Sequence, residues 1–401
     1  VGSEMCIRDR FTPFPALRYR ADLVADAIAP PYDVLSDADV DRLRGQSRHN
    51  IVWVDVPRES DGDAPYELAA ETLRDWIAGG VMERDDTPTF TIYRLRFVDA
   101  SGADRDIVGV LGGLEVVDAG AGGVLPHERV TPKASTDRLD LTRATNANLS
   151  PIWGLSLASG LSKLLEEPAE PVGSVTVDGV EHVVERVSEP ARVAAIADAV
   201  ASDDVLIADG HHRYGVAQIF RDETRRGDAA ESAGAAEDTL AFLSELTGEQ
   251  LSVEAIHRLY TGVSADDLTT ALATRFDIEP APAPDATLLS EMERRGALAL
   301  VTADGASWLL PRPGAFDGVR SIDGAWLEDA LADVEHSVTY QHGVDLAADA
   351  VSSGRATAAV LIRPVSVPEI ERTAREGALM PPKSTFFTPK LRTGFVVREL
   401  G

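Results

Sequence analysis

Hydrophobic and polar positions recur along the chain with two periods, one typical of helices and one typical of strands. Apolar residues spaced three and four apart predict helices over 63–79 and 191–202. Continuous or alternating apolar runs predict neighbouring strands at 89–99 and 107–117, with a short turn between them. The apolar run at 51–56, IVWVDV, predicts a short buried strand. Helices and strands are therefore mixed within the first half of the chain.

Further strand signals follow, and one of them leads directly into a helix. Residues 152–157 predict a strand, and 172–178 with 181–187 predict a hairpin around a glycine turn. Residues 205–209, VLIAD, predict a buried strand, and the residues immediately after it have helical spacing. Strand and helix signals then alternate to the end of the chain.

This pattern predicts an α+β fold with mixed sheets and flanking helices, arranged in two lobes. The Ala/Glu-rich stretch at 228–239 is typical of a surface loop, and we expect the break between the lobes there. An N-terminal lobe would cover 11–227, and a C-terminal α/β lobe would cover 240–401. One elaborated domain is the alternative, because 401 residues allow two to three domains of usual size or a single large one.

The first ten residues, VGSEMCIRDR, do not join the pattern that begins at Phe11. They resemble translated sequencing-adapter read-through at the end of a gene model, so we exclude 1–10 from the fold prediction. Cys6 is the only cysteine in the chain and lies within this segment. We therefore expect no disulfide, no thiolate metal ligand and no cysteine nucleophile, and a reducing cytoplasm as the compartment.

Charge narrows the classes of function. The chain has 66 acidic and 38 basic residues and a net charge of −28, which argues against a protein that mainly coats nucleic acid or an anionic membrane. No apolar run approaches the roughly 18 residues that a membrane helix needs. We expect a small-molecule substrate as the partner, and neither a nucleic acid nor a membrane. Lysine occurs only four times, at Lys133, Lys163, Lys383 and Lys390, and three of these lie in dense polar motifs.

The first of these motifs is DGHHRYGVA, which begins at Asp209 at the end of the predicted buried strand. Gly210 permits a tight turn from strand to helix, and the free N–H groups of a helix start bind anions. His211, His212 and Arg213 add hydrogen-bonding or cationic tips, so the combination suits phosphate. The structural alternative is that Asp209 only caps the helix while the histidines cover its first turn.

A second polar cluster occupies 124–150. A His127–Glu128 pair suits a general base with an orienting partner, or two hard-metal ligands. Lys133 and Arg138 could clamp phosphoryl oxygens, and Asn148 could orient a hydroxyl or a phosphate. A solvated loop before a helix is the alternative.

Two shorter motifs complete the candidate site. Prolines on both sides hold Lys383 and Ser384 in a rigid loop, where they could clamp a phosphate, unless the loop is only a structural crossover. Tyr32 and Asp33 follow Pro30–Pro31 in an extended segment and are candidate substrate contacts.

The motifs carry two resemblances. G-x-x-R-Y-x-x-A from Gly210 to Ala217 resembles the phosphate-binding box of the ParB/sulfiredoxin-like fold, in which some members are free-serine kinases with a DGHHR box. The whole of 11–401 resembles the bacterial and archaeal family named domain of unknown function 1015. The matching segments are FTPFPALRY, IAPPYDVLS, RHNIVWVDVPR, HERVTPKASTDRLDLTRATNANLSPIWGL, IADGHHRYGVA, IHRLY and MPPKSTFFTPKLRTGFV. The association of this family with serine-biosynthesis genes implies phosphotransfer on serine or phosphoserine.

The resulting hypothesis is a small-molecule phosphotransferase, with ATP or ADP as co-substrate, Mg²⁺ as cofactor and serine or a related metabolite as acceptor. Glu128 or Asp209 would be the base, and Lys133 would neutralise developing charge. A metal-assisted phosphatase, with Glu128 and Asp209 as ligands, is the first alternative. A non-enzymatic nucleotide-binding protein is the second. Neither a Walker-type P-loop nor a D-x-D-x-T phosphatase motif occurs in the chain.

Overall fold

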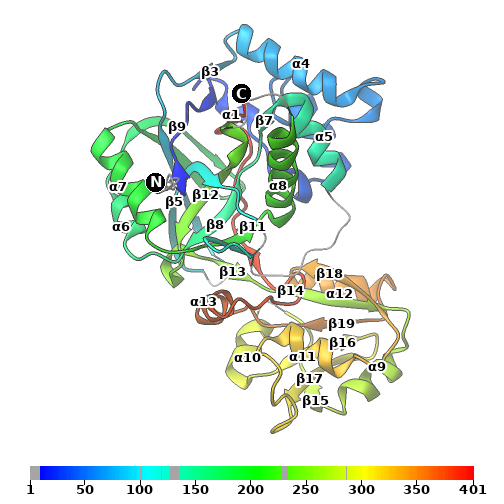
Figure 1. Ribbon diagram of the computed structural model, residues 1–401. Helices are drawn as coiled ribbons and strands as arrows, with labels where there is room; N and C mark the ends of the chain where they lie inside the picture. Colours follow the sequence, from blue (N-terminus) through cyan, green and yellow to red (C-terminus); the bar gives the residue numbers. More distant parts are fainter. Residues whose placement is uncertain (1–9, 100–101, 119, 127–134, 228–233, 286) are drawn as a thin grey trace. The chain divides into compact units, whose positions relative to one another are not determined.

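A computed structural model describes residues 10–99, 102–118, 120–126, 135–227, 234–285 and 287–401 (Figure 1). The described chain forms two compact units. The first unit comprises 10–126, 135–252 and 389–401, so the chain leaves it after Ser252 and returns for the last 13 residues. The second unit comprises 253–388. Each unit mixes helices with its own sheet, which confirms the predicted α+β class with mixed sheets and flanking helices.

The first unit is built on a mixed sheet in which the described residues supply nine strands. Its order is β6-β11-β8-β12-β5-β4-β10-β9, with β1 added beside β5. The β6–β11 and β12–β8 pairs are parallel and the others antiparallel. The strands are β1 Phe11–Thr12, β4 Phe90–Val98, β5 Asp104–Glu115, β6 Val124–Pro126, β8 Ile152–Ser156, β9 Glu170–Val177, β10 Val180–Val187, β11 Val205–Asp209 and β12 Asp238–Glu245.

Helices cover this sheet because their apolar residues recur on one face. Ile196 and Val200 of α7 and Leu161 and Leu165 of α6 are fully buried in the main core of the unit. In Figure 1, α5 and α8 lie side by side. The helices are α1 Val24–Ala27, α2 Asp37–Gln46, α3 Val52–Asp55, α4 Pro65–Ala78, α5 Ser135–Thr145, α6 Leu161–Glu166, α7 Pro190–Ala201 and α8 His211–Arg226, with a 3₁₀ turn η1 at Tyr32–Val34.

Two small ladders connect distant parts of the first unit. Strand β2 (Leu17–Tyr19) pairs with β3 (Met82–Arg84), and β21 (Arg398–Glu399) pairs with β7 (Ala147–Asn148). The second ladder joins the end of the chain to the middle of the same unit.

The second unit has a six-stranded antiparallel sheet in its described residues, in the order β15-β17-β16-β19-β14-β18. Alternate residues of its strands point to opposite faces: Leu259 packs with α10 and α12, and Tyr260 packs with α9 and α11. The strands are β13 Val253–Glu254, β14 Ile256–Thr261, β15 Phe276–Ala281, β16 Leu298–Thr302, β17 Gly305–Pro311, β18 Ser337–His342, β19 Ala358–Leu361 and β20 Phe386–Phe387; the helices are α9 Ala265–Leu272, α10 Leu288–Arg295, α11 Asp323–Ala330, α12 Val344–Ser352 and α13 Val367–Arg375.

One predicted element is wrong. The apolar run at 51–56 forms the short helix α3 instead of a strand. Asn50, which is 1% exposed, donates to the carbonyls of Asp26 and Ile28 and accepts from the Val52 N–H at 3.2 Å. These bonds turn the chain just before the run. A fully buried apolar run of this length has no period of its own, so tertiary contacts decide its conformation.

The predicted lobes, 11–227 and 240–401, stay a prediction about domains. The two compact units have other limits, because β12, which follows the expected break at 228–239, pairs with β5 and β8 in the sheet of the first unit. Arg10, which the fold prediction left out, accepts a hydrogen bond from the Glu115 N–H at its carbonyl (2.9 Å). In the part of the chain that the structure describes, no helix is both long and apolar enough to cross a membrane.

Candidate functional site

The junction of β11 and α8 has the conformation that the sequence predicts. The strand ends at Asp209 and the helix begins at His211, with Gly210 between them in the left-handed region at φ +89°. A Cβ atom on Gly210 would lie 3.0 Å from both Arg213 Nε and Ile152 Cγ2. Both the backbone angle and the close approach therefore require glycine. The tight turn brings the Arg213 guanidinium against the end of the strand.

Asp209 is held from two sides by cations. Its Oδ2 accepts from Arg213 Nη2 at 2.7 Å, and its Oδ1 accepts from Lys390 Nζ at 3.0 Å. Burial alone would raise the pKa of Asp209, but the charges of Lys390 and Arg213 outweigh it and hold that pKa well below its usual range. A carboxylate with a lowered pKa is a weak base, so this arrangement favours Asp209 as an anchor for the two cations over the predicted role of general base.

Arg213 also reaches the next strand. Its Nη1 donates to the carbonyl of Pro151, just before β8. Burial would lower the pKa of Arg213, but the carboxylates of Asp209 and Asp33 raise it, and the guanidinium stays charged. With two of its nitrogens fixed by the protein, Arg213 is a rigid cation at the start of α8.

A groove runs between α5 and α8 and begins at Arg213. One face of each helix lines it, because the contributing residues are spaced three and four apart: Arg138, Leu141 and Thr142 on α5, and Arg213, Val216, Ala217 and Phe220 on α8. Its volume is about 600 Å³, counting the part open to solvent. Polar groups lie at the Arg213 end and apolar groups along the helices. The other lining residues are Tyr32, Asp55, Ala147, Asn148, Leu149, Ser150, Ala236, Asp238, Thr239 and Leu400.

Asp55 fixes the second arginine of the groove. Arg138 Nη1 donates to the Asp55 carbonyl at 2.7 Å and lies 3.3 Å from its carboxylate, while Arg138 Nε donates to Asp137 at 2.8 Å. The Arg138 guanidinium lies over the Tyr32 ring, 4.2 Å from the ring centre. Ser150 Oγ donates to the other Asp55 carboxylate oxygen at 3.3 Å. Burial raises the pKa of Asp55, against the opposing effects of Arg138 and Arg213.

Two donors of this cluster are left for a ligand. Among the described residues, Arg138 Nη2 and the Tyr32 hydroxyl have no hydrogen-bond partner, and both side chains line the groove. Burial raises the pKa of Tyr32, so its hydroxyl keeps its proton. A guanidinium N–H and a protonated hydroxyl both donate, and the partner that they suit is an anionic oxygen.

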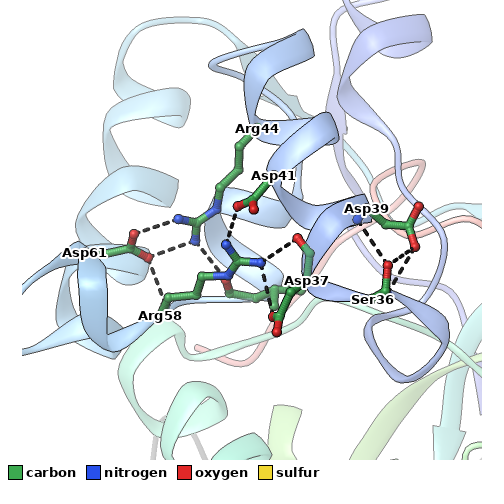
Figure 2. Close-up of polar contacts among 8 residues, drawn as sticks. Ser36, Asp37, Asp39, Asp41, Arg44, Arg58 and Asp61 are labelled. Carbon is green, nitrogen blue, oxygen red and sulfur yellow. Dashed lines mark hydrogen bonds and ion pairs between the residues drawn. The ribbon is translucent and has the colours of Figure 1, made fainter.

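The position of Asp55 depends on an arginine network on α2, which Figure 2 shows. Arg44 donates to both carboxylate oxygens of Asp61 (2.6 and 2.8 Å) and to the carbonyl of Val56 (2.8 Å), the residue after Asp55. Its guanidinium also lies 4.4 Å from the centre of the Trp53 ring. Arg44 thus fixes both the ring and the end of α3, the helix that carries Asp55.

The structure brings together four of the residues predicted from sequence in this groove: Tyr32, Arg138, Asn148 and Arg213. Asn148 uses its amide oxygen within the protein, where it accepts from the Leu240 N–H at 3.0 Å and from Arg398 at 3.4 Å. Its predicted role in orienting a substrate stays a prediction, and only its amide nitrogen could serve it.

The remaining predicted residues of the first unit lie beside the groove. Asp33 is exposed on η1, and His211 and His212 are half-buried on the first turn of α8. Asp33 acts electrostatically on both Arg213 and Asp55. Their assignment to substrate and phosphate stays a prediction.

Lys383 and Ser384 belong to the second unit, in the loop before β20. Lys383 is exposed and has φ +55°, a left-handed conformation that is uncommon outside glycine. Arg258 donates to the Lys383 carbonyl at 2.9 Å, and the Ser384 hydroxyl is buried and donates to the Pro381 carbonyl at 2.7 Å. Ser384 therefore shapes the loop, and Lys383 is the residue of the pair that is presented to solvent.

Three predicted residues, His127, Glu128 and Lys133, lie outside the described residues. The proposed pairing of Glu128 with Asp209 as metal ligands is therefore not tested. Within the described ranges, no three His, Cys, Asp or Glu side chains gather as a metal-binding group.

Sequence reasoning missed Asp55, Ser150 and Lys390. Asp55 lies in the apolar run that was predicted to be a strand, where nothing distinguishes it as a site residue. Lys390 could have been found, since it is one of only four lysines in an arginine-rich chain. Its contact with Asp209, 181 residues earlier in the chain, has no local signal.

The first unit therefore presents an arginine-lined groove within an α+β fold. Residues 11–325 match the family described as "Protein of unknown function (DUF1015)". The chain belongs to this family, as its motifs predict. No curated protein has a significant match to it.

Several solved structures have a distant likeness. A conserved hypothetical protein from Pyrococcus furiosus is 14% identical, with 69% of this chain and 92% of that one covered and a TM-score of 0.38. A free serine kinase in complex with AMP is 14% identical (68% and 89% covered, TM-score 0.38). SbnI with a C-terminal truncation, from Staphylococcus aureus, is 13% identical (72% and 87% covered, TM-score 0.40).

Proposed function

We propose that the chain is a small-molecule phosphotransferase that binds a nucleotide in the groove between α5 and α8. The observation that carries the proposal is that two guanidinium groups, Arg138 and Arg213, line one groove and are each held by an aspartate. Because the protein fixes both cations before a ligand arrives, little free energy is spent on ordering them. The chain as a whole carries a net charge of −28 and repels anions. Two fixed guanidinium groups at one place therefore support binding of phosphate at that place.

The rest of the groove suits the organic part of a nucleotide. Leu141, Val216 and Phe220 form apolar walls beyond the arginines. A base or ribose packed there would leave the phosphates at the start of α8, where the first helical N–H groups also favour negative charge.

The reaction would transfer the terminal phosphoryl group to the hydroxyl of serine or a related metabolite. The P–O bond to the leaving nucleotide breaks, a P–O bond to the acceptor oxygen forms, and the acceptor proton passes to a base, for which Glu128 remains the predicted residue. Arg138 and Arg213 would hold the charge that shifts to the leaving phosphate. Mg²⁺, when bound, would neutralise further phosphate charge.

A phosphorus NMR time course tests this function. One tube contains the full chain with Mg²⁺, L-serine and either ATP or ADP, and a second contains the chain with Mg²⁺ and O-phosphoserine alone. A phosphoserine signal in the first tube supports the proposal. Inorganic phosphate from phosphoserine alone would replace it with the metal-assisted hydrolase. Unchanged spectra in both tubes would overturn the assignment of serine as acceptor.

A matched pair of variants links any activity to the groove. Arg138→Ala removes a groove guanidinium from α5, and Arg143→Ala removes an exposed one from the same helix, where it pairs with Asp140 and Glu223. Nucleotide affinity should fall at least about tenfold in the first variant and stay within about twofold in the second. Tyr32→Phe, which removes only the free hydroxyl, keeps the test valid if Arg138→Ala does not fold. Equal affinity in all three chains would contradict the placement of the nucleotide.

A further inference from the structure

The second unit contains a hollow of its own, distinct from the groove of the first unit. Its floor is one face of two paired strands, where Arg258 of β14 lies opposite Tyr340 of β18, and Tyr260 lies opposite Val338. Its wall is one face of α11, and its volume is about 330 Å³ with the open part included. The lining residues are Arg258, Tyr260, Gly324, Leu327, Glu328, His336, Val338 and Tyr340.

The hydroxyl of a buried tyrosine faces this hollow without a hydrogen-bond partner among the described residues. Tyr260 is 3% exposed, and among the described residues its hydroxyl has no hydrogen bond. Burial holds the pKa of Tyr260 above its usual value, so the hydroxyl keeps its proton and can donate. This donor is available to an acceptor atom of a ligand placed in the hollow.

A cation lies at the base of the hollow. Arg258 is 4% exposed, its guanidinium lies 4.9 Å from the centre of the Tyr340 ring, and it donates to the carbonyls of Ile256, Pro382 and Lys383. A Cβ atom on Gly324 would lie 2.9 Å from its Nη2, so the glycine lets the guanidinium lie under the first turn of α11. Arg258 thus places positive charge beside the Tyr260 hydroxyl.

The rim of the hollow carries groups that accept hydrogen bonds, in contrast to the cation at its base. Glu328 is exposed on α11, one turn after Gly324. His336 Nδ1 lies 2.7 Å from the carbonyl of Val334, which can only accept, so Nδ1 carries the proton and Nε2 of the neutral ring is an acceptor. A carboxylate and a ring nitrogen that accept hydrogen bonds suit an ammonium group. Leu327 and Val338 supply apolar surface between the two ends.

We propose that this hollow binds a free aliphatic α-amino acid. The ligand carboxylate would accept from the Tyr260 hydroxyl and lie beside Arg258, its ammonium would donate to Glu328 and His336 Nε2, and its side chain would pack on Leu327 and Val338. The separation of a positive base from a negative rim matches a zwitterion and disfavours ligands with only one charge. This inference does not depend on the proposed function, because no residue of the groove takes part in it.

Isothermal titration calorimetry of the full chain with L-leucine, L-valine, L-serine and L-lysine tests the proposal. Leucine and valine should bind more tightly than serine and lysine. Leucinamide, which lacks the negative charge, and N-acetylleucine, which lacks the positive one, should each bind at least about tenfold more weakly than leucine. No binding heat from either aliphatic amino acid at millimolar concentration would overturn the proposal, and so would equal affinity for all four.

Variants separate this hollow from any other amino-acid site. Tyr260→Phe removes only the unpartnered hydroxyl and should weaken leucine binding about tenfold without loss of stability. Glu328→Gln should weaken it by a similar factor, whereas Glu279→Gln, at an exposed carboxylate on β15, should not. Arg138→Ala, in the groove of the first unit, should leave leucine affinity unchanged. If Tyr260→Phe and Glu328→Gln bind leucine as the wild type does, the ligand lies elsewhere and the assignment is wrong.

Discussion

Gly210 and Gly215 lie five residues apart, but they differ in backbone conformation and in the space available for an added methyl group. Gly210 has φ +89° and neighbours at 3.0 Å from an added Cβ, whereas Gly215 lies inside α8 with no atom within 4 Å. Gly210→Ala should lower the free energy of unfolding by at least about 1–2 kcal/mol, because the left-handed backbone and the contact with Arg213 both oppose it. Gly215→Ala should raise it by about 0.5–1 kcal/mol through helix propensity. Urea unfolding of both variants measures the difference, and equal stability would contradict the strained turn.

A single buried histidine should set part of the pH dependence of stability. His182 is fully buried, forms a hydrogen bond between Nδ1 and the Tyr93 hydroxyl (2.7 Å), and has its pKa lowered to about 3 by burial. The unfolded chain takes up a proton at this residue near pH 6.5, and the folded chain does not. The contribution of His182 to the free energy of unfolding is therefore fully present above pH 6.5. It falls by about 1.4 kcal/mol per pH unit as the pH drops from 6.5 towards 3.

His182→Gln removes this dependence and keeps a side chain that can form a hydrogen bond with Tyr93. Unfolding free energies measured from pH 8 to pH 5 should decline less steeply in the variant than in the wild type, by one proton's contribution. Between pH 8 and pH 7 the two slopes should agree, which serves as the internal control. Parallel slopes below pH 6 would show that His182 is protonated in the folded protein.

For single residues, the sequence identifies site residues that lie in recognisable motifs and misses those whose role depends on contacts with distant parts of the chain. Arg213, Arg138 and Tyr32 lie in polar motifs, and all three line the groove. Asp55 is preceded by apolar residues, and its role comes from Arg138, 83 positions later. No local pattern can encode such a pair without a correct tertiary fold.

At the scale of elements, the two arginines of Figure 2 differ in the burial of their ion pairs: Arg44 pairs with a mostly buried carboxylate, and Arg58 pairs with exposed ones. Arg44 and Asp61 are both mostly buried, with side chains 10% and 14% exposed, whereas the partners of Arg58, Asp37 and Asp41, are largely exposed. Removing Arg44 leaves the Val56 carbonyl without its partner and the mostly buried Asp61 carboxylate with only the Arg58 N–H. Removing Arg58 leaves solvated carboxylates.

Arg44→Met should therefore lower the free energy of unfolding by at least about 2 kcal/mol, and Arg58→Met by less than about 1 kcal/mol. Because Arg44 fixes the end of α3, its loss should also weaken nucleotide binding at Arg138, which Arg58→Met should not do. Guanidinium unfolding and calorimetry with ADP measure both effects. Equal losses in the two variants would mean that burial does not distinguish the pairs.

Most elements follow from local pattern, and the exceptions have one cause. The hairpin of β9 and β10 turns at Gly179 (φ +76°), and the order of β11, Gly210 and α8 is as predicted, because alternation, glycine and helical spacing are local signals. The run at 51–56 fails because every residue in it is apolar apart from Asp55. Long-range pairing, such as that of β21 with β7, is not indicated by the local sequence of either strand.

At the scale of the whole molecule, the last residues of the chain belong to the first unit and follow the second unit in the sequence. After the second unit it returns through 389–401, where the Val397 carbonyl accepts from Leu17 N–H (3.0 Å) and the Thr393 carbonyl accepts from Ala29 N–H (3.1 Å). Arg398 is 5% exposed and donates to the carbonyls of Asp238 and Ala235 at 2.9 Å. The first unit therefore depends on residues that are synthesised after the entire second unit, and its contacts have a high sequence separation.

A chain that ends at Thr388 should lose the stability of the first unit and keep that of the second. Without the C-terminal segment, the amides of Leu17 and Ala29 lose their acceptors, and buried side chains such as Val397 leave the core. Hydrogen exchange should then show at least about hundredfold faster exchange at these amides, whereas Thr357, which donates to the Tyr260 carbonyl within the second unit, keeps its protection. If both units lose protection together, the two unfold as one cooperative body. If Leu17 and Ala29 stay protected, the returning segment is not what completes the first unit.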